Sequence, residues 1–210
     1  TITADITARS LDISGTKVYD GSADAESSKL SLSNLVSGQT ITLSGTGTLG
    51  SAAVGSQSIT GMGTLAISDN SARASNYELS GSLLMTITAR PVTVTGSRAY
   101  DGTANAEASS FTTFSNLVSG ETLSLSGTGQ ISSANVGSGK TVSHQSLALA
   151  NGSGAASNYS LGSVVLDVTQ RVIDLDGIRA FDGSTSISSS DIQTLGNIVS
   201  GETLILSGSG

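Results

Sequence analysis

The chain of 210 residues has no cysteine, no tryptophan and one proline, and its aromatic residues are three Phe and four Tyr. The absence of cysteine is compatible with chance in a chain of this length. It also fits a long exported protein, in which free thiols would cross-link in an oxidising compartment. Because aromatic residues are scarce, we expect a core of Val, Ile, Leu and Ala and no row of exposed rings on which a sugar could stack.

Charged residues make up only 12 % of the chain, and the net charge is −7. An acidic chain without basic clusters is not suited to nucleic acid, whose phosphates require Lys and Arg, or to an anionic membrane surface. No run of 18 apolar residues is present, so no transmembrane helix is predicted. Gly, Ser and Thr are abundant, and no stretch of a dozen residues shows a clean helical period.

The chain repeats itself at a period of 81–82 residues. Tyr19-Asp20-Gly21 returns 81 residues later as Tyr100-Asp101-Gly102 and again as Phe181-Asp182-Gly183. Residues 33–38 return as 115–120 and 196–201, and Ser75-Asn76-Tyr77 returns as Ser157-Asn158-Tyr159. A tandem array favours a structural or binding role over a single catalytic pocket.

This period divides the chain into four parts. We assign residues 1–9 to the last strand of a preceding repeat, 10–90 to repeat 1, 91–171 to repeat 2 and 172–210 to a partial repeat 3. We therefore expect the chain to be a segment of a longer array.

Alternation of apolar and polar residues predicts half-buried strands. The clearest case is 83–89, in which every second residue is apolar and Thr86 and Thr88 face the other side. The apolar positions of this strand and its counterparts are Leu83, Met85, Ile87 and Ala89; Val164, Leu166 and Val168; and Ile2, Ala4 and Ile6. Further strands are predicted at 40–43, 122–125 and 203–206, each followed by a Gly-rich break.

These patterns predict an all-β fold, with each repeat an antiparallel, β-sandwich-like module of six to eight strands. A grasp-like sheet is also compatible with them, and a β-solenoid is disfavoured because no period of 20–30 residues is present. Only Arg90 and Pro91, or Arg171 alone, separate consecutive strands at the repeat boundaries. Because such boundaries lack a flexible linker, we expect the modules to be arranged end to end as an elongated rod.

The aromatic-Asp-Gly triplets predict tight turns, since Asp binds its own backbone and Gly accepts positive φ. We predict that the rings before Asp-Gly, those of Tyr19, Tyr100 and Phe181, are buried in the core. We predict the same for Tyr77 and Tyr159 of the recurring Ser-Asn-Tyr motif. On this interpretation Tyr100→Ala costs about 3–5 kcal/mol. We predict no catalytic, cofactor-binding or metal-binding residues.

The acidic residues at and near these turns suggest one alternative, a cation site. A calcium site could use Asp20, Asp24 and Glu26, or Asp101 and Glu107, but hard cations require six to eight oxygens and few carboxylates are present.

Other patterns suggest chemistry less strongly. Residues 134–141 match a loose nucleotide-binding loop, which needs a helix after it; a Gly-rich turn is favoured. His144 is the only histidine and stands near no nucleophile motif. Asn151 and Asn158 lie in glycosylation tripeptides, which are common in Ser-rich chains.

Several motifs recur in order along essentially the whole chain. They lie at residues 17–21, 118–121, 126–129, 136–142, 156–159 and 168–169. In this order they resemble the YDG repeats of large secreted bacterial adhesins of the filamentous-haemagglutinin type. Two positions depart from that pattern: Gln39 stands where an acidic residue is usual, and Phe181 replaces Tyr.

The resemblance implies a stalk segment of a secreted or outer-membrane-associated adhesin, projecting an adhesive domain for cell adhesion or biofilm formation. Its partners would be the neighbouring repeats, with a polysaccharide or cell-surface ligand bound by other parts of the protein. The alternative is that the repeats themselves bind a polysaccharide or a host protein. Neither reading requires a cofactor or a catalytic activity.

Overall fold

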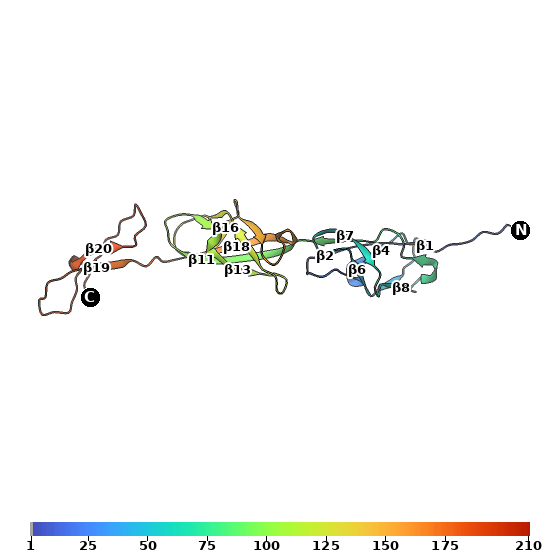
Figure 1. Cartoon of the computed structure of the whole chain (residues 1–210), viewed down its shortest axis with the longest axis horizontal. Coiled ribbons are helices and arrows are strands. Elements are labelled where there is room, and N and C mark those ends of the chain that lie inside the picture. Colours follow the sequence, from blue (N-terminus) through green and yellow to red (C-terminus); the bar gives the residue numbers. More distant parts are fainter. Residues whose placement is uncertain (1) are drawn as a thin grey trace. The chain divides into compact units, whose positions relative to one another are not determined.

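The computed structural model describes residues 2–210 and is built from strands, with short 3₁₀ turns as its only helical elements within that range (Figure 1). The predicted all-β class is confirmed. None of the helical turns in these residues is long and apolar enough to cross a membrane.

The contacts divide the chain into two compact units. The first comprises Thr1–Thr93, Phe114–Ser124 and Leu149–Gly162; the second comprises Val94–Thr113, Leu125–Ala148 and Ser163–Gly210. The division falls inside strands of the second repeat, so the units do not coincide with the sequence repeats. The first unit holds all of repeat 1 together with part of repeat 2.

Repeat 1 is organised around one six-stranded sheet of order β3-β6-β7-β10-β2-β4 and two ribbons, β1-β9 and β5-β8. Its elements are β1 (Arg9–Ser10), β2 (Asp12–Val18), β3 (Asp24–Glu26), η1 (Ser27–Lys29), β4 (Leu30–Ser33), β5 (Thr42–Ser44), β6 (Thr46–Leu49), β7 (Gly55–Gly61), β8 (Ala66–Ser68), η2 (Ala74–Asn76), β9 (Tyr77–Glu78) and β10 (Leu84–Thr88).

The apolar positions of these strands form the core of repeat 1. Met85 and Ile87 of β10 are fully buried, while Thr86 and Thr88, which alternate with them, are exposed, as the pattern predicts. A smaller cluster gathers Leu11, Ile41, Ala72 and Tyr77.

Glycine is required where the core side chains approach the backbone closely. A Cβ on Gly47 would lie 2.6 Å from Leu65 and 3.1 Å from Ile59. Residue 47 thus leaves the space that these two side chains fill.

The sheet is mixed, which corrects the expectation of purely antiparallel modules. The first long strand and the last one pair in parallel, with Thr86 opposite Thr16 and Ile87 opposite Lys17. The short pair β1-β9 is also parallel. Parallel partners need a long connection, and here the whole repeat lies between β2 and β10, so local alternation could not reveal the direction of pairing.

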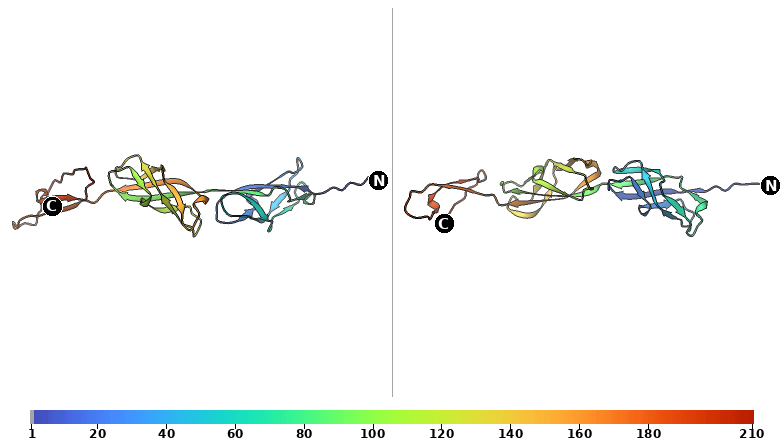
Figure 2. Two further views of the ribbon diagram at one scale, coloured as in Figure 1. Left: turned by 45° about the horizontal axis from the view of Figure 1, so that its top comes forward. Right: turned by 60° about the horizontal axis from the view of Figure 1, so that its bottom comes forward.

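Repeat 2 reproduces this sheet with the order β12-β15-β16-β18-β11-β13, and β14 pairs with β17. Its strands run from green through yellow to orange in Figure 2. Its elements are β11 (Arg90–Ala99), β12 (Asn105–Glu107), η3 (Ala108–Ser110), β13 (Phe111–Ser115), β14 (Leu123–Ser126), β15 (Thr128–Ile131), β16 (Gly137–Ser143), β17 (Ala148–Asn151), η4 (Ala156–Asn158) and β18 (Tyr159–Thr169). Val164, Leu166 and Val168 of β18 are buried, in the places that Leu83, Met85 and Ile87 occupy in repeat 1 by sequence.

The partial third repeat contains β19 (Asp174–Gly177), η5 (Ser189–Asp191) and β20 (Ile192–Gly196), with β19 antiparallel to β20. The strand predicted at 203–206 is absent from the structure. In repeats 1 and 2 the equivalent strands β5 and β14 pair with β8 and β17, whose counterparts would fall after residue 210. A segment without that partner has no ladder to join.

The strand predicted at the start of the chain is also absent. Residues 2–8 lie outside any strand, and Ile2 and Ile6 are fully exposed. Their counterparts in β10 are held between β2 and β7, and no such strands flank residues 2–8. Thr1, which belongs to the same predicted strand, lies outside the described residues.

Candidate functional site: the junction between repeats

The aromatic-Asp-Gly turn of repeat 1 follows the end of β2. Gly21 has φ +80°, and the Ser22 backbone N–H donates to Asp20 Oδ1 over 2.9 Å. Lys17, a buried cation, donates from Nζ to Asp20 Oδ1 at 3.0 Å and to the Ser22 carbonyl at 2.9 Å. A buried ammonium is costly unless it is paired and hydrogen-bonded, and this turn supplies both partners.

The same turn recurs in the other two repeats. Gly102 and Gly183 have φ +79° and +82°, and their Asp residues form ion pairs with Arg98 and Arg179, respectively. The basic residue two positions before the aromatic ring is therefore part of the motif. In the Asp20 carboxyl, burial favours the neutral form, but the hydrogen bonds from Ser22 and Lys17 outweigh it and hold its pKa below the ordinary value.

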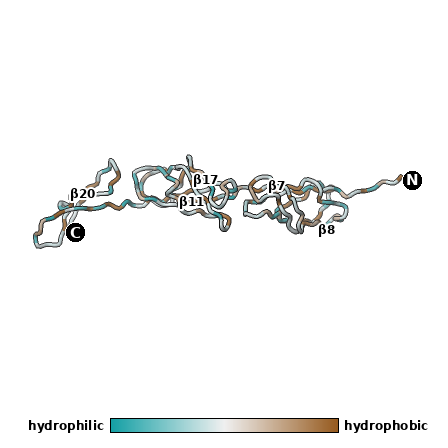
Figure 3. The backbone as a smooth tube through the Cα atoms, in the orientation of Figure 1, coloured by the Kyte–Doolittle hydropathy of each residue, from teal (hydrophilic) through white to brown (hydrophobic). Residues whose placement is uncertain are grey.

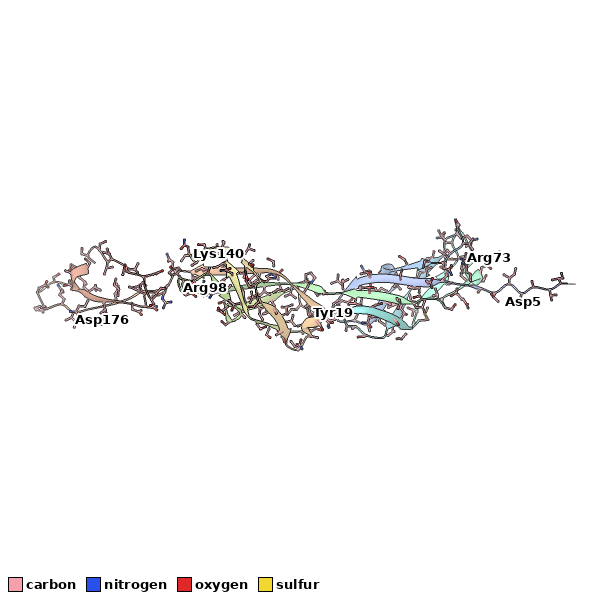
Figure 4. All side chains as sticks on the ribbon, turned by 90° about the horizontal axis from the view of Figure 1, so that it is seen from above. Asp5, Tyr19, Arg73, Arg98, Lys140 and Asp176 are labelled. Carbon is pink, nitrogen blue, oxygen red and sulfur yellow. The ribbon has the colours of Figure 1, made fainter. Side chains whose placement is uncertain are left out.

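The ring of Tyr19 is buried against residues of repeat 2 that belong to the same compact unit. Its centroid lies 5.3 Å from that of Tyr159, with the rings edge to face at 79°. The two phenols share one carboxylate: Tyr19 Oη donates to Glu121 Oε1 at 2.6 Å and Tyr159 Oη donates to Oε2 at 2.5 Å. The Val118 N–H donates in turn to Tyr159 Oη at 3.1 Å. Tyr19 is labelled in Figure 4.

Glycine leaves room for this carboxylate. A Cβ on Gly154 would lie 2.5 Å from Glu121 Oε2. The Asn158 side chain accepts from the Val54 N–H at 3.0 Å, which adds another polar bond between the repeats.

Arg90 makes a further connection at the start of β11. Its Nε and Nη2 donate to the carbonyl and the Oδ1 of Asn116 over 2.6 and 2.8 Å, and Nη1 donates to the Tyr19 carbonyl over 3.3 Å. Asn116 has φ +69° and donates back from Nδ2 to the Pro91 carbonyl at 2.7 Å. One guanidinium thus joins the turn of repeat 1 to the loop of repeat 2.

This Arg-Asn contact was not predicted from the sequence. The signal was present, because Arg9, Arg90 and Arg171 recur at steps of 81, and each binds an Asn of the recurring 33–38 motif. Nothing in the local pattern links an Arg to an Asn some 25 positions later, so the pair becomes visible only when all three copies are compared.

The second junction lies within the second compact unit. It has the same residue types as the first, but its turn tyrosine is less buried. Tyr100 Oη donates to Glu202, and Arg171 Nη1 donates to the Tyr100 carbonyl at 3.4 Å. Tyr100 is half-buried, which departs from the predicted core position. Among the described residues, the one aromatic pair is Tyr19 with Tyr159, and Tyr100 has no ring packed on it.

Phe181 was predicted to be a core residue, and that prediction is wrong: its side chain is 94 % exposed. The loop and tyrosine that cover Tyr19 have no counterparts after Phe181 in the 210 residues. Tyr19, Tyr77 and Tyr159 are buried. Of these, Tyr19 is the turn aromatic, and the residues that cover it, Glu121 and Tyr159, come from the repeat that follows.

The carboxylates weighed for calcium are engaged elsewhere or dispersed. Asp20 and Asp101 bind the basic residues of their own turns, and among residues 2–210 no group of three His, Cys, Asp or Glu side chains is close enough to hold a metal ion. Residues 137–143 form β16, so a strand stands where a nucleotide-binding loop would need a helix. His144 lies in the turn after that strand.

The two glycosylation tripeptides differ in exposure. Asn158 is buried and bound to Val54, whereas Asn151 is exposed at the end of β17. Asn158 and Tyr159, one copy of the recurring Asn-Tyr pair, therefore both make hydrogen bonds at the junction.

A family model for the YDG domain matches residues 3–83 and again residues 85–166. The chain belongs to the YDG domain family. No curated protein and no solved structure matches it. The two matched YDG domains follow one another with the junction of Tyr19, Arg90 and Glu121 between them, and their boundary falls a few residues before the division at 90 and 91 that the repeats suggest.

The tyrosines of the YDG junction predict a loss of stability at high pH. The hydrogen bond to Glu121, together with burial, raises the pKa of Tyr19 from 10.0 to about 12, and burial with the same carboxylate raises the pKa of Tyr159. Because the folded pKa lies above the unfolded one, this contribution is complete below pH 10 and is lost as the pH rises toward 12. Titration of phenolate absorbance should show a group with a midpoint near pH 12 that is missing in Tyr19→Phe. If Tyr19→Phe titrates like the unchanged chain, the shared carboxylate does not control Tyr19.

Proposed function

We propose that these tandem YDG domains form a structural stalk segment of a secreted or cell-surface bacterial adhesin, which projects an adhesive domain from the cell. In this role the domains act mechanically. Each adds length, and the junctions keep successive domains from bending freely. The acidic, Ser- and Thr-rich surfaces reduce sticking between neighbouring stalks.

The observation that carries the proposal is the density of polar bonds at the junction. Arg90 binds both repeats, and Glu121 accepts from a tyrosine of each. Hydrogen bonds to charged groups are stronger than those between neutral groups, and partial burial shields them from water. Domains joined by a flexible linker would not be expected to share such hydrogen bonds.

The rival role, binding of a polysaccharide or host protein by the repeats themselves, receives less support. Tyr19, Tyr77, Tyr159 and Phe111 are buried, and the phenol hydroxyls of the three tyrosines are occupied by hydrogen bonds within the fold. Sugar-binding surfaces rely on accessible rings, and the aromatic residues of this chain are mostly committed to packing.

Small-angle X-ray scattering of the 210-residue chain, with and without EDTA, tests the stalk. A compact globule of this length would have a radius of gyration of about 17 Å. We expect roughly twice that value, unchanged by EDTA. A value near that of the globule would contradict the stalk and favour a composite binding surface. A fall in the value on adding EDTA would assign the extension to a bound cation.

Stiffness of the junction can be measured separately with nitroxide labels at the exposed positions Ser56 and Ser143. We expect a narrow distance distribution that becomes several times broader in Arg90→Ala, because that change removes the bonds to both Asn116 and Tyr19. Arg73→Ala, which removes the same charge at an exposed position away from the junction, is the matched control. A broad distribution in the unchanged chain would show that the domains move independently.

A further inference from the structure

The first long strand of repeat 1 and its last strand lie side by side and run in the same direction. β2 pairs with β10 in parallel, with Thr16 opposite Thr86 and Val18 opposite Thr88. All the other strands of the six-stranded sheet lie between these two in the chain. A pull on the two ends of repeat 1 therefore acts directly on this one pairing.

The direction of the pull decides how the hydrogen bonds of the pairing are loaded. Because the strands are parallel, the start of β2 and the end of β10 lie at opposite ends of the paired region. Tension along the chain therefore slides one strand past the other, and all the bonds between them carry the load together. A pull that separated the strands from one end would break the bonds one after another. Forced unfolding is governed by the rate of unfolding, so loading many bonds at once raises the force that is needed.

The parallel pairing extends beyond β2 and β10. The short strands β1 and β9, which precede them in the chain, are also parallel. Three backbone hydrogen bonds lengthen the pairing: Leu11 N–H to the Glu78 carbonyl at 2.8 Å, Ile13 N–H to the Ser82 carbonyl at 2.7 Å and Tyr19 N–H to the Thr88 carbonyl at 2.9 Å. We call this pairing of residues 9–19 with residues 77–88 the terminal seam. It joins the whole first segment of repeat 1 to its whole last segment.

Buried side chains shield the terminal seam from water. Ile13, Met85 and Ile87 are at most 1 % exposed. Figure 3 shows apolar residues in brown among the strands of repeat 1, around the label of β7, which pairs with β10. A hydrogen bond that opens in a buried place leaves its donor and acceptor without partners, which costs more than opening one that water can replace. Burial therefore adds to the resistance of the seam.

The load passes from the terminal seam into the next repeat without a linker. Only Ala89 separates β10 from β11, and Arg90 Nη1 donates to the Tyr19 carbonyl at 3.3 Å, at the end of the seam. Repeat 2 has the same pairing, since β11 and β18 are neighbours in its sheet and the Tyr100 N–H donates to the Thr169 carbonyl at 2.9 Å. The seam is therefore a feature of the repeat and recurs along the chain.

We propose that the terminal seam is a mechanical clamp, which bears tension applied along the chain and sets the force at which repeat 1 unfolds. In repeat 2, β11 and β18 have the same role. The antiparallel pairs of the sheet, such as β2-β4 and β6-β7, do not join the two ends of the repeat and open only after the clamp. The clamp follows from the strand pairing and does not depend on the proposed stalk role, because a chain with another role would resist tension in the same way.

Pulling single molecules of the 210-residue chain in two directions tests the clamp. The chain has no cysteine, so two introduced cysteines define where the force acts. Thr7→Cys with Thr93→Cys loads the seam in shear, whereas Val18→Cys with Thr93→Cys opens it from one end; all three positions are exposed. The mean unfolding force should be at least about twice as high for the first pair, because its bonds share the load. The length released, up to about 3.6 Å for each residue between the cysteines, identifies the unfolding of repeat 1.

Urea unfolding should give the two cysteine variants the same free energy, so that a difference in force reports the direction of the pull alone. Equal unfolding forces for the two pairs of cysteines would overturn the proposal. A globule-like radius of gyration in the scattering experiment would contradict the stalk and leave this comparison of forces as it is.

A matched pair of substitutions separates the clamp from general stability. Ile87→Val and Ile59→Val each remove one methylene group from a buried side chain, but Ile87 lies in the terminal seam, whereas Ile59 lies in β7 and pairs with β6. Both should lower the midpoint of urea unfolding by similar amounts. Only Ile87→Val should lower the unfolding force measured through cysteines at positions 7 and 93. A fall of the same size in Ile59→Val, or no fall in Ile87→Val, would show that the whole core and not the seam resists the load.

Discussion

Replacing Tyr19 with alanine is expected to lower the free energy of unfolding by about 3–5 kcal/mol, the usual range for deleting a buried aromatic side chain. The ring is 5 % exposed and packs edge to face on Tyr159, so its removal leaves a cavity that the strands around it cannot easily close. It also leaves Glu121 with one phenol donor instead of two. Equilibrium unfolding in urea, followed by far-ultraviolet circular dichroism, gives the change.

Tyr100→Ala is the matched comparison, since it alters the same position of the same motif. The sequence alone assigns it the full cost of about 3–5 kcal/mol. The structure revises this to about 1–2 kcal/mol, because Tyr100 is half-buried and no ring packs on it as Tyr159 packs on Tyr19. Equal losses in the two variants would show that the following repeat does not bury the turn aromatic.

Most of the strands could be predicted from the sequence because alternation is a local property. The pattern at 83–89 predicts which side chains of β10 are buried, and Met85 and Ile87 are. The same pattern at residues 2–8 predicts a strand that does not form, because a strand needs partners and none flanks that segment. Alternation therefore shows that a segment is able to form a strand. Whether the strand forms depends on neighbouring strands with which it can pair.

The junction could be predicted only in part, for a related reason. The recurring Tyr-Asp-Gly indicates a turn beside a ring, but the ring is covered by Glu121 and Tyr159, more than 100 positions away. The residues that cover such a ring depend on which repeat follows it, and that is a property of the tertiary contacts.

Replacing Glu121 with alanine is expected to cost about 2–6 kcal/mol, because it leaves the hydroxyls of Tyr19 and Tyr159 without this acceptor and each unpaired buried hydroxyl costs about 1–3 kcal/mol. Glu121→Gln keeps an acceptor oxygen but replaces the other with a donor, so it should cost about half as much. Repeat 1 provides the precedent, since Tyr77 donates to Gln39 there. Urea unfolding of both variants gives the two values.

A double-mutant cycle shows whether the effect comes from the shared carboxylate. In the Tyr19→Phe background the hydroxyl is already gone, so Glu121→Ala should cost about 1–2 kcal/mol less than in the unchanged chain. Thr122→Ala, at the neighbouring position, removes the two bonds between the Thr122 hydroxyl and Ser153 and serves as the control for general disturbance of the loop. If the losses from Tyr19→Phe and Glu121→Ala simply add, then the two side chains are not coupled, and the Tyr19–Glu121 bond does not hold the two repeats together. Coupling at this pair and none at Thr122 would place the energetic link between neighbouring YDG domains at a single carboxylate, which is the arrangement that a mechanically continuous array needs.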